Sequence, residues 1–491
     1  MIPAGRVFLE ALRLDREEAE AVRRRAIGAL ELDVAGFVLF GGEAGEVGRL
    51  TEDLRERAGR PLWFAADLER GAGQQFAGLT MAPPPAGLAR HPDPVAAVRE
   101  AAERTALEAR SVGVNWVLAP VLDLDLGPEN PIVGTRSFGE NPAEVAALGE
   151  AWIEACQDAG VAACAKHFPG HGRTTADSHA ELPVVAADRA TLLVDLEPFR
   201  RVAGRVASMM TAHVAYPALG CGGPATRDPG VLGQLLRDEL GFGGLVVTDA
   251  LIMEGARADT GGGRAGGAEI EALAAGCDLL LYPPDLAAAV RRLGREATAS
   301  DALAGRIAAA AARSRETLSR FEPHEPPPRP GTGSDADGEG GGRKLAEACI
   351  VAVGEDPASR LDPGRETAIA AVWDDRPAPG RPPLGEVFAA ELQARGWRIA
   401  DPDAAGAARV LLVAATPQGW KGAATLTEGG RAAVRAQLRT LPPAYVIVLG
   451  HLRLLDALGG IGACAWGAEP ALEAAAARWL DDRVRRGRAG A

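Results

Sequence analysis

Histidine is scarce in this chain, with seven among 491 residues. Three of the seven lie within one short segment, KHFPGHGRTTADSH, at residues 166–179. Pro169, Gly170 and Gly172 interrupt this segment, so it cannot be an interior helix or strand. A loop that is dense in titratable groups is more often a functional site than a scaffold. This loop is therefore the first candidate for a site.

Long apolar runs and targeting signals are absent as well. No stretch of about 18 uninterrupted apolar residues occurs, so no membrane span is expected. The N-terminal residues MIPAGRVFLEALRLDREE contain acids and no apolar run that ends in a cleavage site, so no signal peptide is expected. The six cysteines lack CxxC spacing, which favours reduced, mostly buried thiols over disulfides. A cytoplasmic protein is expected.

The charge balance limits the kinds of partner. The formal net charge is −13 and the isoelectric point is near 5.2. An acidic chain is not suited to a nucleic acid or an anionic membrane surface, so neither is expected as a partner. The hydrophobic share of 47% and the charged share of 24% are ordinary for a globular protein.

Before residue 322, short apolar runs alternate with longer helical patterns rich in Ala, Glu and Arg. The strand-like runs are about 6–9, 34–40, 62–66, 114–118, 161–166, 207–213, 244–248 and 277–281. The helical patterns include 94–112, 142–159, 188–204, 229–240 and 265–275. Apolar strands that alternate with helices are typical of a parallel sheet covered on both faces. Eight such units predict an α/β fold, a (β/α)8 TIM-type barrel. A doubly wound open sheet is the alternative.

A composition break divides the chain. Residues 322–343, EPHEPPPRPGTGSDADGEGGGR, combine Pro, Gly and acidic residues without apolar periodicity, which is typical of a linker. Strand-like runs then restart at about 348–354, 368–373, 409–415, 445–450 and 463–468. They predict a second, smaller α/β sandwich-like domain, with an open sheet between helices. The expected organisation is a barrel over 1–321, a linker over 322–343 and a C-terminal α/β domain over 344–491.

Polar side chains recur at the C-terminal ends of five consecutive strand-like runs, where a barrel of this type carries its site. These ends carry Asp67 with Glu69, then Asp123, Lys166 with His167, His213 and Asp249. Scattered surface charges would not follow strand ends so regularly. Asp249 comes directly after the apolar run LVVT, where a carboxylate is costly unless it has a task. A helix N-cap is the alternative role for Asp249.

Several of these residues also have a plain structural interpretation. His213 is either a satisfied core histidine or a site residue. Asp123 is expected to cap the next turn or to hold its loop in shape. Arg136, within GTRSFGENP, is either an arm that binds an anion or a hydroxyl, or a cation that packs the loop. Lys166 and His167 would face opposite ways on a strand, but at a strand end both can turn into the cleft.

The pair Asp177 and His179 is the most informative feature of the loop. A carboxylate two residues before a histidine can bond its Nδ1–H, fix the tautomer and raise the basicity of Nε2. An Asx-type turn with an exposed histidine is the alternative. An acid/base dyad on a loop that faces Asp249 would suit glycosyl transfer. One group would attack the anomeric carbon while the other protonates the leaving oxygen.

Two other classes of protein compete with this hypothesis. A zinc hydrolase could use the three loop histidines (167, 171 and 179) with Asp177. The Pro-Gly pair between His167 and His171 forbids the helix that such a ligand pair needs, and Asp249 would be left without a role. A catalytically silent carbohydrate-binding barrel is the third reading. The complete set of Asp249, His179 and Asp177 argues against it.

Five segments together resemble a known family. They are KHFPGHGRTTADSHAELP, RSFGENP, NWVLAPVLDL, MTAHVAYP and VVTDALIMEGA. They resemble glycoside hydrolase family 3, specifically its β-N-acetylhexosaminidase (NagZ-type) branch, over about residues 5–320. The resemblance implies a retaining enzyme that removes terminal GlcNAc from glycosides such as cell-wall muropeptide fragments, in peptidoglycan recycling. Its partner would be a small carbohydrate substrate, with no cofactor and no metal.

The resemblance also implies roles for individual residues. Asp249 would be the nucleophile that forms the glycosyl-enzyme intermediate, and His179 would be the acid/base with Asp177 as its partner. Contacts with sugar hydroxyls and the N-acetyl group are implied for Asp67, Arg136, Lys166 and His167. His213, at the end of the sixth run, is a further candidate for substrate binding. In the wider family, β-glucosidases carry an acid/base glutamate on the second domain, whereas this branch uses the loop histidine.

The loop DLERGAGQQF, residues 67–76, departs from the family pattern. The family commonly shows Asp-Gln-Glu-Gly-Gly-Arg-Val followed by a second arginine. Here Ala72 and Gln75 stand where the two arginines would fall. Those arginines help to hold the outer hydroxyls or the next sugar, so another sugar preference is open. A histidine acid/base also brings no negative charge near an incoming anion, so a phosphorylase that uses phosphate in place of water is an alternative.

Overall fold

The structure is a computed structural model in which two compact units are distinguished. It describes residues 3–178, 181–257, 267–322, 335–354, 357, 360–374, 381–404, 406–415, 425–440, 443–458 and 462–489. The first unit comprises Met1–Met81, Val98–Leu126 and Gly139–Asp335. The second comprises Ala82–Ala97, Gly127–Phe138 and Ala336–Ala491. Each unit is described by itself below.

The first unit contains eight parallel strands. They are β1 Phe8–Arg13, β2 Gly36–Phe40, β3 Trp63–Ala66, β4 Trp116–Val117, β5 Ala162–Phe168, β6 Ser208–Thr211, β7 Leu245–Thr248 and β8 Leu280–Leu281. Their order in the sheet is β7-β6-β5-β4-β3-β2-β1-β8. An isolated parallel bridge between Val247 and Leu279 links the two ends and nearly closes the barrel. The predicted (β/α)8 barrel is confirmed, and the open-sheet alternative is wrong.

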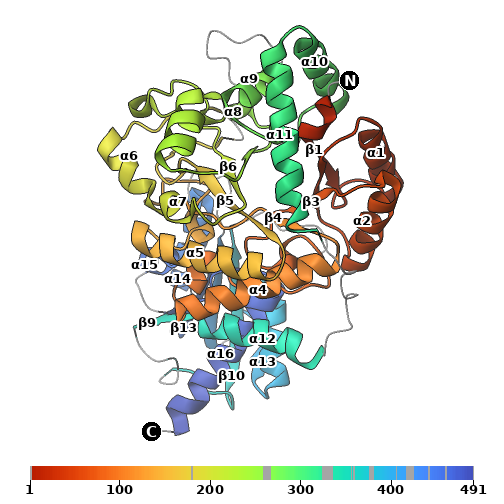
Figure 1. The fold of residues 1–491 in the computed structure, drawn as a ribbon. Helices are drawn as coiled ribbons and strands as arrows, with labels where there is room; N and C mark the ends of the chain where they lie inside the picture. The colour runs from red at the N-terminus through yellow and green to blue at the C-terminus, as the bar shows by residue number, and fades with distance from the viewer. Residues whose placement is uncertain are drawn as a thin grey trace. The chain divides into compact units, whose positions relative to one another are not determined.

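Helices lie outside these strands (Figure 1). The longer ones are α1 Ala19–Glu31, α2 Ala44–Ala58, α4 Pro94–Ser111, α5 Pro142–Asp158, α6 Arg189–Asp195, α7 Glu197–Val202, the π-helix η6 Gly230–Glu239, α9 Ala268–Ala275, α10 Leu286–Thr298 and α11 Asp301–Ser319. The pattern at 188–204 predicted one helix, but α6 and α7 divide there. Pro198 lies in the first turn of the second helix, where its missing N–H costs no hydrogen bond, although it could not continue the first helix.

Two buried tryptophans show how the barrel interior is filled. The rings of Trp63 and Trp116 lie 4.9 Å apart between centroids. Each indole N–H has an acceptor, Ser314 Oγ at 3.0 Å for Trp63 and Ser208 Oγ at 2.8 Å for Trp116. Large rings with a polar atom can fill a core only when that atom is bonded. The strand ends beyond this packed layer are therefore free to carry the site.

The first strand differs from its predicted position at 6–9. Residues Ala4–Val7 form a short 3-10 turn, and β1 runs from Phe8 to Arg13 in register with β2. The prediction ended too early because the carboxylate of Glu10 interrupts the apolar run. In the structure Glu10 is only 4% exposed, and its Oε1 lies 3.5 Å from Arg25 Nη1.

The second unit contains a six-stranded sheet. Its strands are β9 Val351–Val353, β10 Glu366–Trp373, β11 Arg398–Ala400, β12 Ala408–Ala415, β13 Tyr445–Gly450 and β14 Gly462–Cys464, in the order β11-β10-β12-β13-β14-β9. Only β9 is antiparallel to its neighbour among these described pairs. The helices are α12 Asp335–Ala348, α13 Glu386–Ala394, α14 Glu428–Thr440, α15 Arg453–Ala457 and α16 Pro470–Ala489. The predicted second α/β sheet is confirmed, and the edge strand β11 was missed because its residues, Arg398-Ile399-Ala400, form no apolar run.

Two short segments that precede the linker in sequence belong to this second unit. Residues 82–97 contain α3 Pro85–Leu88, and residues 127–138 contain the 3-10 turn η3 Gly134–Arg136. A Cβ added to Gly87 would lie 3.0 Å from Cγ of Trp466, so α3 packs closely beside the end of β14. Helix α12 begins at Asp335, inside the segment predicted as a linker. The domain limits 1–321, 322–343 and 344–491 stay a prediction.

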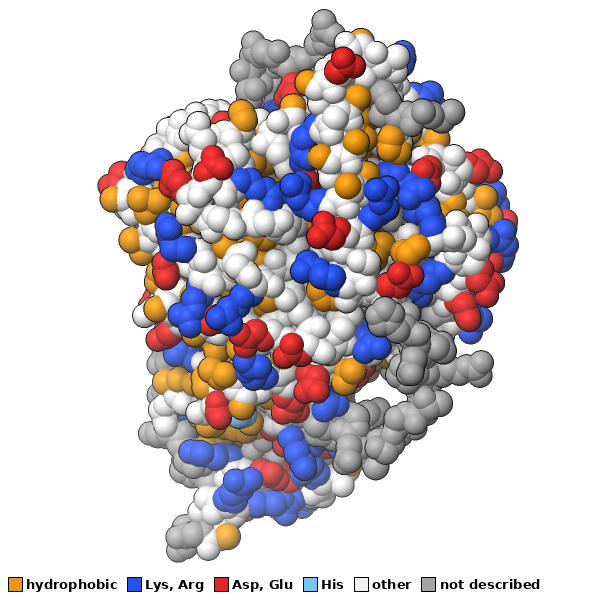
Figure 2. All heavy atoms as spheres, in the orientation of Figure 1, with side chains coloured by type: hydrophobic (Ala, Val, Ile, Leu, Met, Phe, Trp, Pro, Cys, Tyr) orange, Lys and Arg blue, Asp and Glu red, His pale blue; other side chains and the backbone are white. Residues whose placement is uncertain are grey.

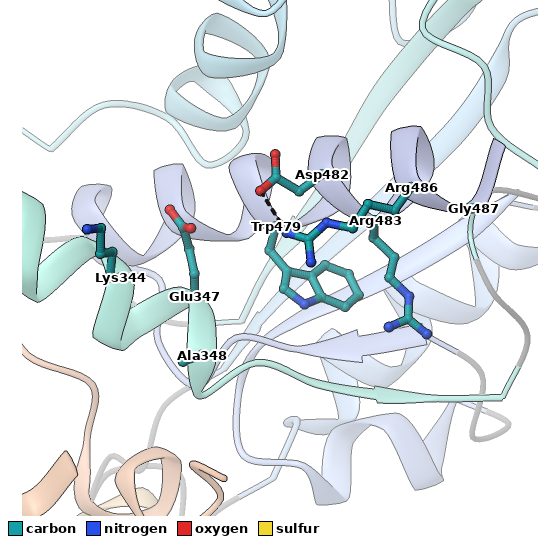
Figure 3. A pocket seen from close by; sticks show the side chains of 8 residues that line it. All are labelled: Lys344, Glu347, Ala348, Trp479, Asp482, Arg483, Arg486 and Gly487. Atoms are coloured by element: carbon teal, nitrogen blue, oxygen red, sulfur yellow. Dashed lines mark hydrogen bonds and ion pairs between the residues drawn. The ribbon is translucent and has the colours of Figure 1, made fainter. Parts of the chain in front are cut away.

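A groove of about 440 Å³ lies between α12 and α16 in the second unit (Figure 3). Its lining includes Trp479, Arg483, Arg486, Glu347 and Asp482. Both carboxylates already have arginine partners. Oε1 of Glu347 accepts a hydrogen bond from Arg478 at 2.6 Å, and Asp482 lies 3.3 Å from Arg486.

Surface and thiol features agree with ordinary globular packing. Acidic and basic side chains are interspersed over the face drawn in Figure 2. Within the part of the chain that the structure describes, no helix is long and apolar enough to cross a membrane. All six cysteines are free and buried.

Candidate active site

Five strand ends of the barrel bring their polar residues into one cluster. Asp67 follows β3, Asp123 follows β4, and Lys166 and His167 lie on β5. His213 and Asp249 follow β6 and β7. Lys166 contacts Asp67, His167 contacts Asp123, and the charge of Asp249 interacts with Lys166, His167 and His213. These six predicted residues therefore meet at the C-terminal end of the barrel.

Lys166 is held by two carboxylates. Its Nζ lies 2.7 Å from Oδ1 of Asp67 and 2.7 Å from Oε1 of Glu69. The Lys166 side chain is 2% exposed, and a buried ammonium is tolerated only when it is paired. Glu69 is buried with it, whereas Asp67 is 30% exposed. Glu69 thus neutralises Lys166, while Asp67 has an exposed edge for a ligand.

Asp123 fixes the orientation of His167. Oδ2 of Asp123 lies 2.6 Å from Nδ1 of His167, and its Oδ1 accepts the backbone N–H of His167 at 3.2 Å and of His171 at 2.6 Å. Burial alone would raise the pKa of Asp123, but His167 and these hydrogen bonds outweigh it and lower the pKa. An ionised Asp123 accepts a hydrogen bond from the Nδ1–H of His167, so Nε2 is the ring nitrogen outside this pair. Asp123 thus holds the loop that starts at His167, rather than its own loop.

Lys166 and His167 are adjacent, yet both belong to the cluster. Lys166 bonds the segment after β3, and His167 bonds the segment after β4. The peptide bond that joins them is cis, as is the bond from Phe168 to Pro169. The pairing of β5 with β6 also shifts register between Ala165 and Phe168. This shift in register makes this part of β5 irregular, so the alternation of faces along a strand does not apply to it.

Asp249 stands directly after β7 and is partly buried. Its Oδ1 accepts the backbone N–H of Ala250 at 2.7 Å. Burial would raise the pKa of Asp249, but its interactions with His167, His213, the Ala250 N–H and the Lys166 ammonium outweigh burial and lower the pKa. Asp249 is therefore ionised at neutral pH. The next helix, α8 Glu254–Arg257, begins five residues later, so the helix-cap alternative is wrong.

His213 is a core residue beside the site. It is 1% exposed, and its Nδ1 lies 2.8 Å from Oγ1 of Thr226. The Thr226 hydroxyl also lies 2.8 Å from Oγ1 of Thr211 and 3.1 Å from the Ala212 carbonyl oxygen, so His213 belongs to a buried polar network. Burial lowers the pKa of His213, while the charge of Asp249 opposes that shift. His213 is thus a neutral imidazole whose Nε2 is buried and has no hydrogen-bond partner among the described residues.

His171 organises the loop instead of facing a ligand. Its Nδ1 lies 2.7 Å from Oγ1 of Thr174, and its Nε2 lies 3.3 Å from Oγ of Ser178. Burial lowers the pKa of His171 to about 4, so the ring is neutral. Both ring nitrogens are engaged within the loop, which argues against the zinc hydrolase. Among the described residues no group of three potential ligands could hold a metal.

Three predicted residues are not placed with this cluster. His179 lies outside the described residues, so the dyad that it would form with Asp177 stays a prediction. Asp177 is partly buried, and its carbonyl accepts the Glu181 N–H at 3.1 Å. Arg136 belongs to the second unit, where its Nη1 donates to the Ile132 carbonyl at 3.1 Å.

The loop after β3 is closed by its own amide side chains. Oε1 of Gln75 accepts the Gly41 N–H at 3.2 Å, and Oε1 of Gln74 accepts the Arg70 N–H at 3.1 Å. Ala72 is fully buried. The two positions that depart from the family pattern therefore serve the packing of this loop.

Comparison with known proteins agrees with this geometry. The model of the glycosyl hydrolase family 3 N-terminal domain matches residues 9–315. The chain belongs to glycoside hydrolase family 3. It is therefore an enzyme that hydrolyses O-glycosyl bonds. The resemblance inferred from the loop and strand-end motifs is confirmed.

Curated relatives of this family 3 hydrolase are similar over the barrel. A beta-hexosaminidase of Thiobacillus denitrificans is 40% identical over 276 residues, which cover 52% of this chain and 73% of that protein. A beta-hexosaminidase of Bordetella avium is 35% identical over 300 residues, or 58% of this chain and 83% of that protein. A Cellulomonas fimi protein named beta-N-acetylglucosaminidase/beta-glucosidase is 36% identical, and the match covers 47% of it.

Solved structures match both units. A family 3 beta-N-acetylglucosaminidase from Paenibacillus sp. has a TM-score of 0.80 at 25% identity, over 98% of this chain and 96% of that one. A beta-glucoside phosphorylase has a TM-score of 0.84 at 18% identity, over 98% of this chain and 91% of that one. The second likeness shows the fold alone.

Proposed function

We propose that this family 3 hydrolase is a retaining β-N-acetylhexosaminidase that removes terminal GlcNAc from glycosides such as cell-wall muropeptide fragments. The observation that carries the proposal is an ionised Asp249 at the end of β7, beside Lys166 and His167. Relatives that bear the name beta-hexosaminidase support the choice of sugar. The cytoplasmic location and the role in recycling cell-wall fragments stay predictions.

In the proposed first step, Asp249 attacks the anomeric carbon. The Ala250 N–H holds Oδ1, which leaves Oδ2 as the attacking oxygen. The new C1–O bond forms as the bond to the leaving group breaks, and His179 gives its proton to the departing oxygen. A carboxylate with a lowered pKa suits this role, because it must be ionised before it attacks.

In the second step, His179 takes a proton from water as the water oxygen attacks C1. The ester bond to Asp249 breaks and the carboxylate is regenerated, so the configuration is retained overall. Asp177 would accept the Nδ1–H of His179 and stabilise the imidazolium. If phosphate attacked in place of water, the same residues would make a phosphorylase.

The sugar would bind through the cluster at the other strand ends. The exposed edge of Asp67 is placed to accept a sugar hydroxyl, and Lys166 is fixed beside it at 2.7 Å. His167 would present Nε2, because Asp123 engages Nδ1. Arg136 and His213 stay proposed substrate-binding residues.

A panel of nitrophenyl β-glycosides tests the proposal. GlcNAc, GalNAc, glucose and xylose glycosides would be compared with and without phosphate. We expect the GlcNAc glycoside to give the highest kcat/KM, with free GlcNAc as the product in both buffers. A preference for glucose, or a sugar phosphate as the product, would contradict the proposed sugar or acceptor.

The nucleophile is tested separately. Asp249→Ala should lower kcat/KM by more than about 10³-fold without unfolding the protein. The surface variant Asp53→Asn on α2 is the control and should stay active. A slow-leaving fluoro-glycoside should label the peptide that contains LVVTDAL, residues 245–251. A label on another peptide rejects Asp249.

A further inference from the structure

A backbone hydrogen bond joins the two segments that carry the proposed catalytic groups. The Gly255 N–H donates to the Ser178 carbonyl at 3.0 Å. Gly255 lies six residues after Asp249, on α8. Ser178 lies between Asp177 and His179 in the chain. The position of the acid/base segment relative to the nucleophile segment therefore depends on this contact.

Only glycine fits at position 255. A Cβ there would lie 2.9 Å from the Ser178 oxygen, 3.1 Å from the His213 oxygen and 3.2 Å from the Glu181 oxygen. All three are backbone carbonyls, which cannot rotate away as a flexible side chain could. Two segments, the loop that contains Ser178 and Glu181 and the one that contains His213, thus close around the α-carbon of one buried residue.

Ser178 is also held from its other side. Its Oγ lies 3.3 Å from Nε2 of His171, and Ser178 is 2% exposed. The Thr174 hydroxyl donates to the His171 carbonyl at 3.0 Å, so Nδ1 of His171 is the donor to Thr174. In the neutral ring Nε2 is then an acceptor, and the Ser178 hydroxyl donates to it. Both the side chain and the carbonyl of Ser178 are therefore fixed.

We propose that Gly255 is a positioning residue for acid/base catalysis, because it holds Ser178, the residue that precedes His179 in the chain, against the segment that follows Asp249. The inference rests on the proposed function, in which Asp249 is the nucleophile and His179 the acid/base. A methyl group at position 255 displaces the Ser178 carbonyl and breaks its hydrogen bond. Proton delivery to the leaving oxygen then suffers, whereas the sugar contacts of Lys166 and His167 are unaffected.

Leaving-group dependence tests this inference. Gly255→Ala is compared with Gly204→Ala, an exposed site where an added Cβ meets nothing within 4 Å. The substrates are phenyl β-GlcNAc, whose leaving oxygen needs a proton, and 2,4-dinitrophenyl β-GlcNAc, whose leaving group does not. For Gly255→Ala we expect kcat/KM to fall about 10–10²-fold with the phenyl glycoside and less than about threefold with the dinitrophenyl glycoside. Equal losses, or none, would overturn the inference.

Two further measurements cover a Gly255→Ala variant that does not fold. Ser178→Ala removes the hydroxyl that binds His171 but keeps the carbonyl, so it should show a smaller loss with the same leaving-group bias. Amide exchange over residues 171–178 should be faster in Ser178→Ala than in the wild type. The inference is wrong if Ser178→Ala loses the same activity with both substrates and if its amide exchange over residues 171–178 is as slow as in the wild type.

Failure of the proposed function has a different signature. A wild-type protein that turns over neither GlcNAc glycoside, or an Asp249→Ala variant that stays active, rejects the proposed function itself. The role of Gly255 alone is rejected if the wild type is active and needs Asp249, but Gly255→Ala loses the same activity with the phenyl and the dinitrophenyl glycoside.

Discussion

Asp123 Oδ2 lies 2.6 Å from Nδ1 of His167, and both residues are buried. The same carboxylate accepts two backbone N–H groups of the loop that starts at His167. One side chain thus sets the tautomer of His167 and the course of the loop toward Ser178. A carboxylate that orients an imidazole in this way is a common device for fixing which ring nitrogen faces a ligand.

Asp123→Asn tests this relationship. The amide removes the charge that favours the Nδ1–H tautomer, while its oxygen, in the place of Oδ1, can still accept the two backbone N–H groups. A hydrogen bond to a charged group contributes about 1.5–3 kcal/mol, so we expect kcat/KM for nitrophenyl GlcNAc to fall about 10–10²-fold. Steady-state kinetics and a melting curve are the measurements. Unchanged kinetics in a folded variant would show that His167 needs no partner.

Glu10 predicts a pH-dependent loss of stability. Burial raises the pKa of Glu10 from its ordinary value of 4.5 to about 7, despite the opposing charge of Arg25. The folded protein therefore holds a proton on Glu10 that the unfolded chain releases above pH 4.5, so stability falls as pH rises from about 4.5 to 7. In Glu10→Gln this fall should be smaller. We expect the difference in unfolding free energy between variant and wild type to grow by about 2–3 kcal/mol between pH 5 and pH 8.

Urea unfolding at a series of pH values measures this difference. Glu20→Gln, on the exposed face of α1, is the matched control, and its difference from the wild type should stay constant with pH. If the unfolding free energy of Glu10→Gln changed with pH in parallel with that of the wild type, burial would not raise the pKa of Glu10.

Asp278 predicts a separation of stability from activity. This fully buried carboxylate forms ion pairs with three guanidinium groups, with N–O distances of 2.8 Å to Arg306, 2.6 Å to Arg313 and 2.9 Å to Arg237. Asp278 immediately precedes Leu279, near the start of the last strand-like run. This is the N-terminal end of the barrel strands, whereas the site lies at their C-terminal end. Asp278→Asn leaves three guanidinium groups without their shared charge, so we expect a loss of about 3–5 kcal/mol of unfolding free energy.

At temperatures where the variant stays folded, kcat/KM of Asp278→Asn should equal that of the wild type, because residues at the N-terminal ends of barrel strands do not touch the substrate. Denaturant titration followed by circular dichroism gives the stability. Asp301→Asn, at the exposed start of α11, is the control. Wild-type stability in Asp278→Asn would show that the three arginines find other partners.

The sequence predicts the barrel well because eight apolar runs mark its strands, and it predicts the site because five of those runs end in polar residues. Other partners could not be found this way. Glu69 pairs with Lys166 across two strands, and Thr226 with His213 across a loop, so both contacts depend on how the chain folds back. Gly255 carries no sequence signal either, because the neighbouring carbonyls exclude a side chain there.

The last prediction concerns Asp177 and separates the glycosidase from the zinc hydrolase. If Asp177 orients His179, Asp177→Asn should keep GlcNAc binding but lose most of its activity, because an amide cannot stabilise the imidazolium and can favour the wrong tautomer. General acid catalysis contributes about 10²–10⁴-fold, which bounds the expected fall in kcat. The basic limb of the pH–rate profile should move to lower pH, because an imidazolium without its carboxylate holds its proton less tightly.

Product inhibition by GlcNAc measures binding, and the pH dependence of kcat from pH 5 to 9 measures the position of the basic limb. Chelator treatment of the wild type should change nothing. Activity that follows bound zinc, or an Asp177→Asn variant with an unchanged rate and pH profile, would reject the dyad.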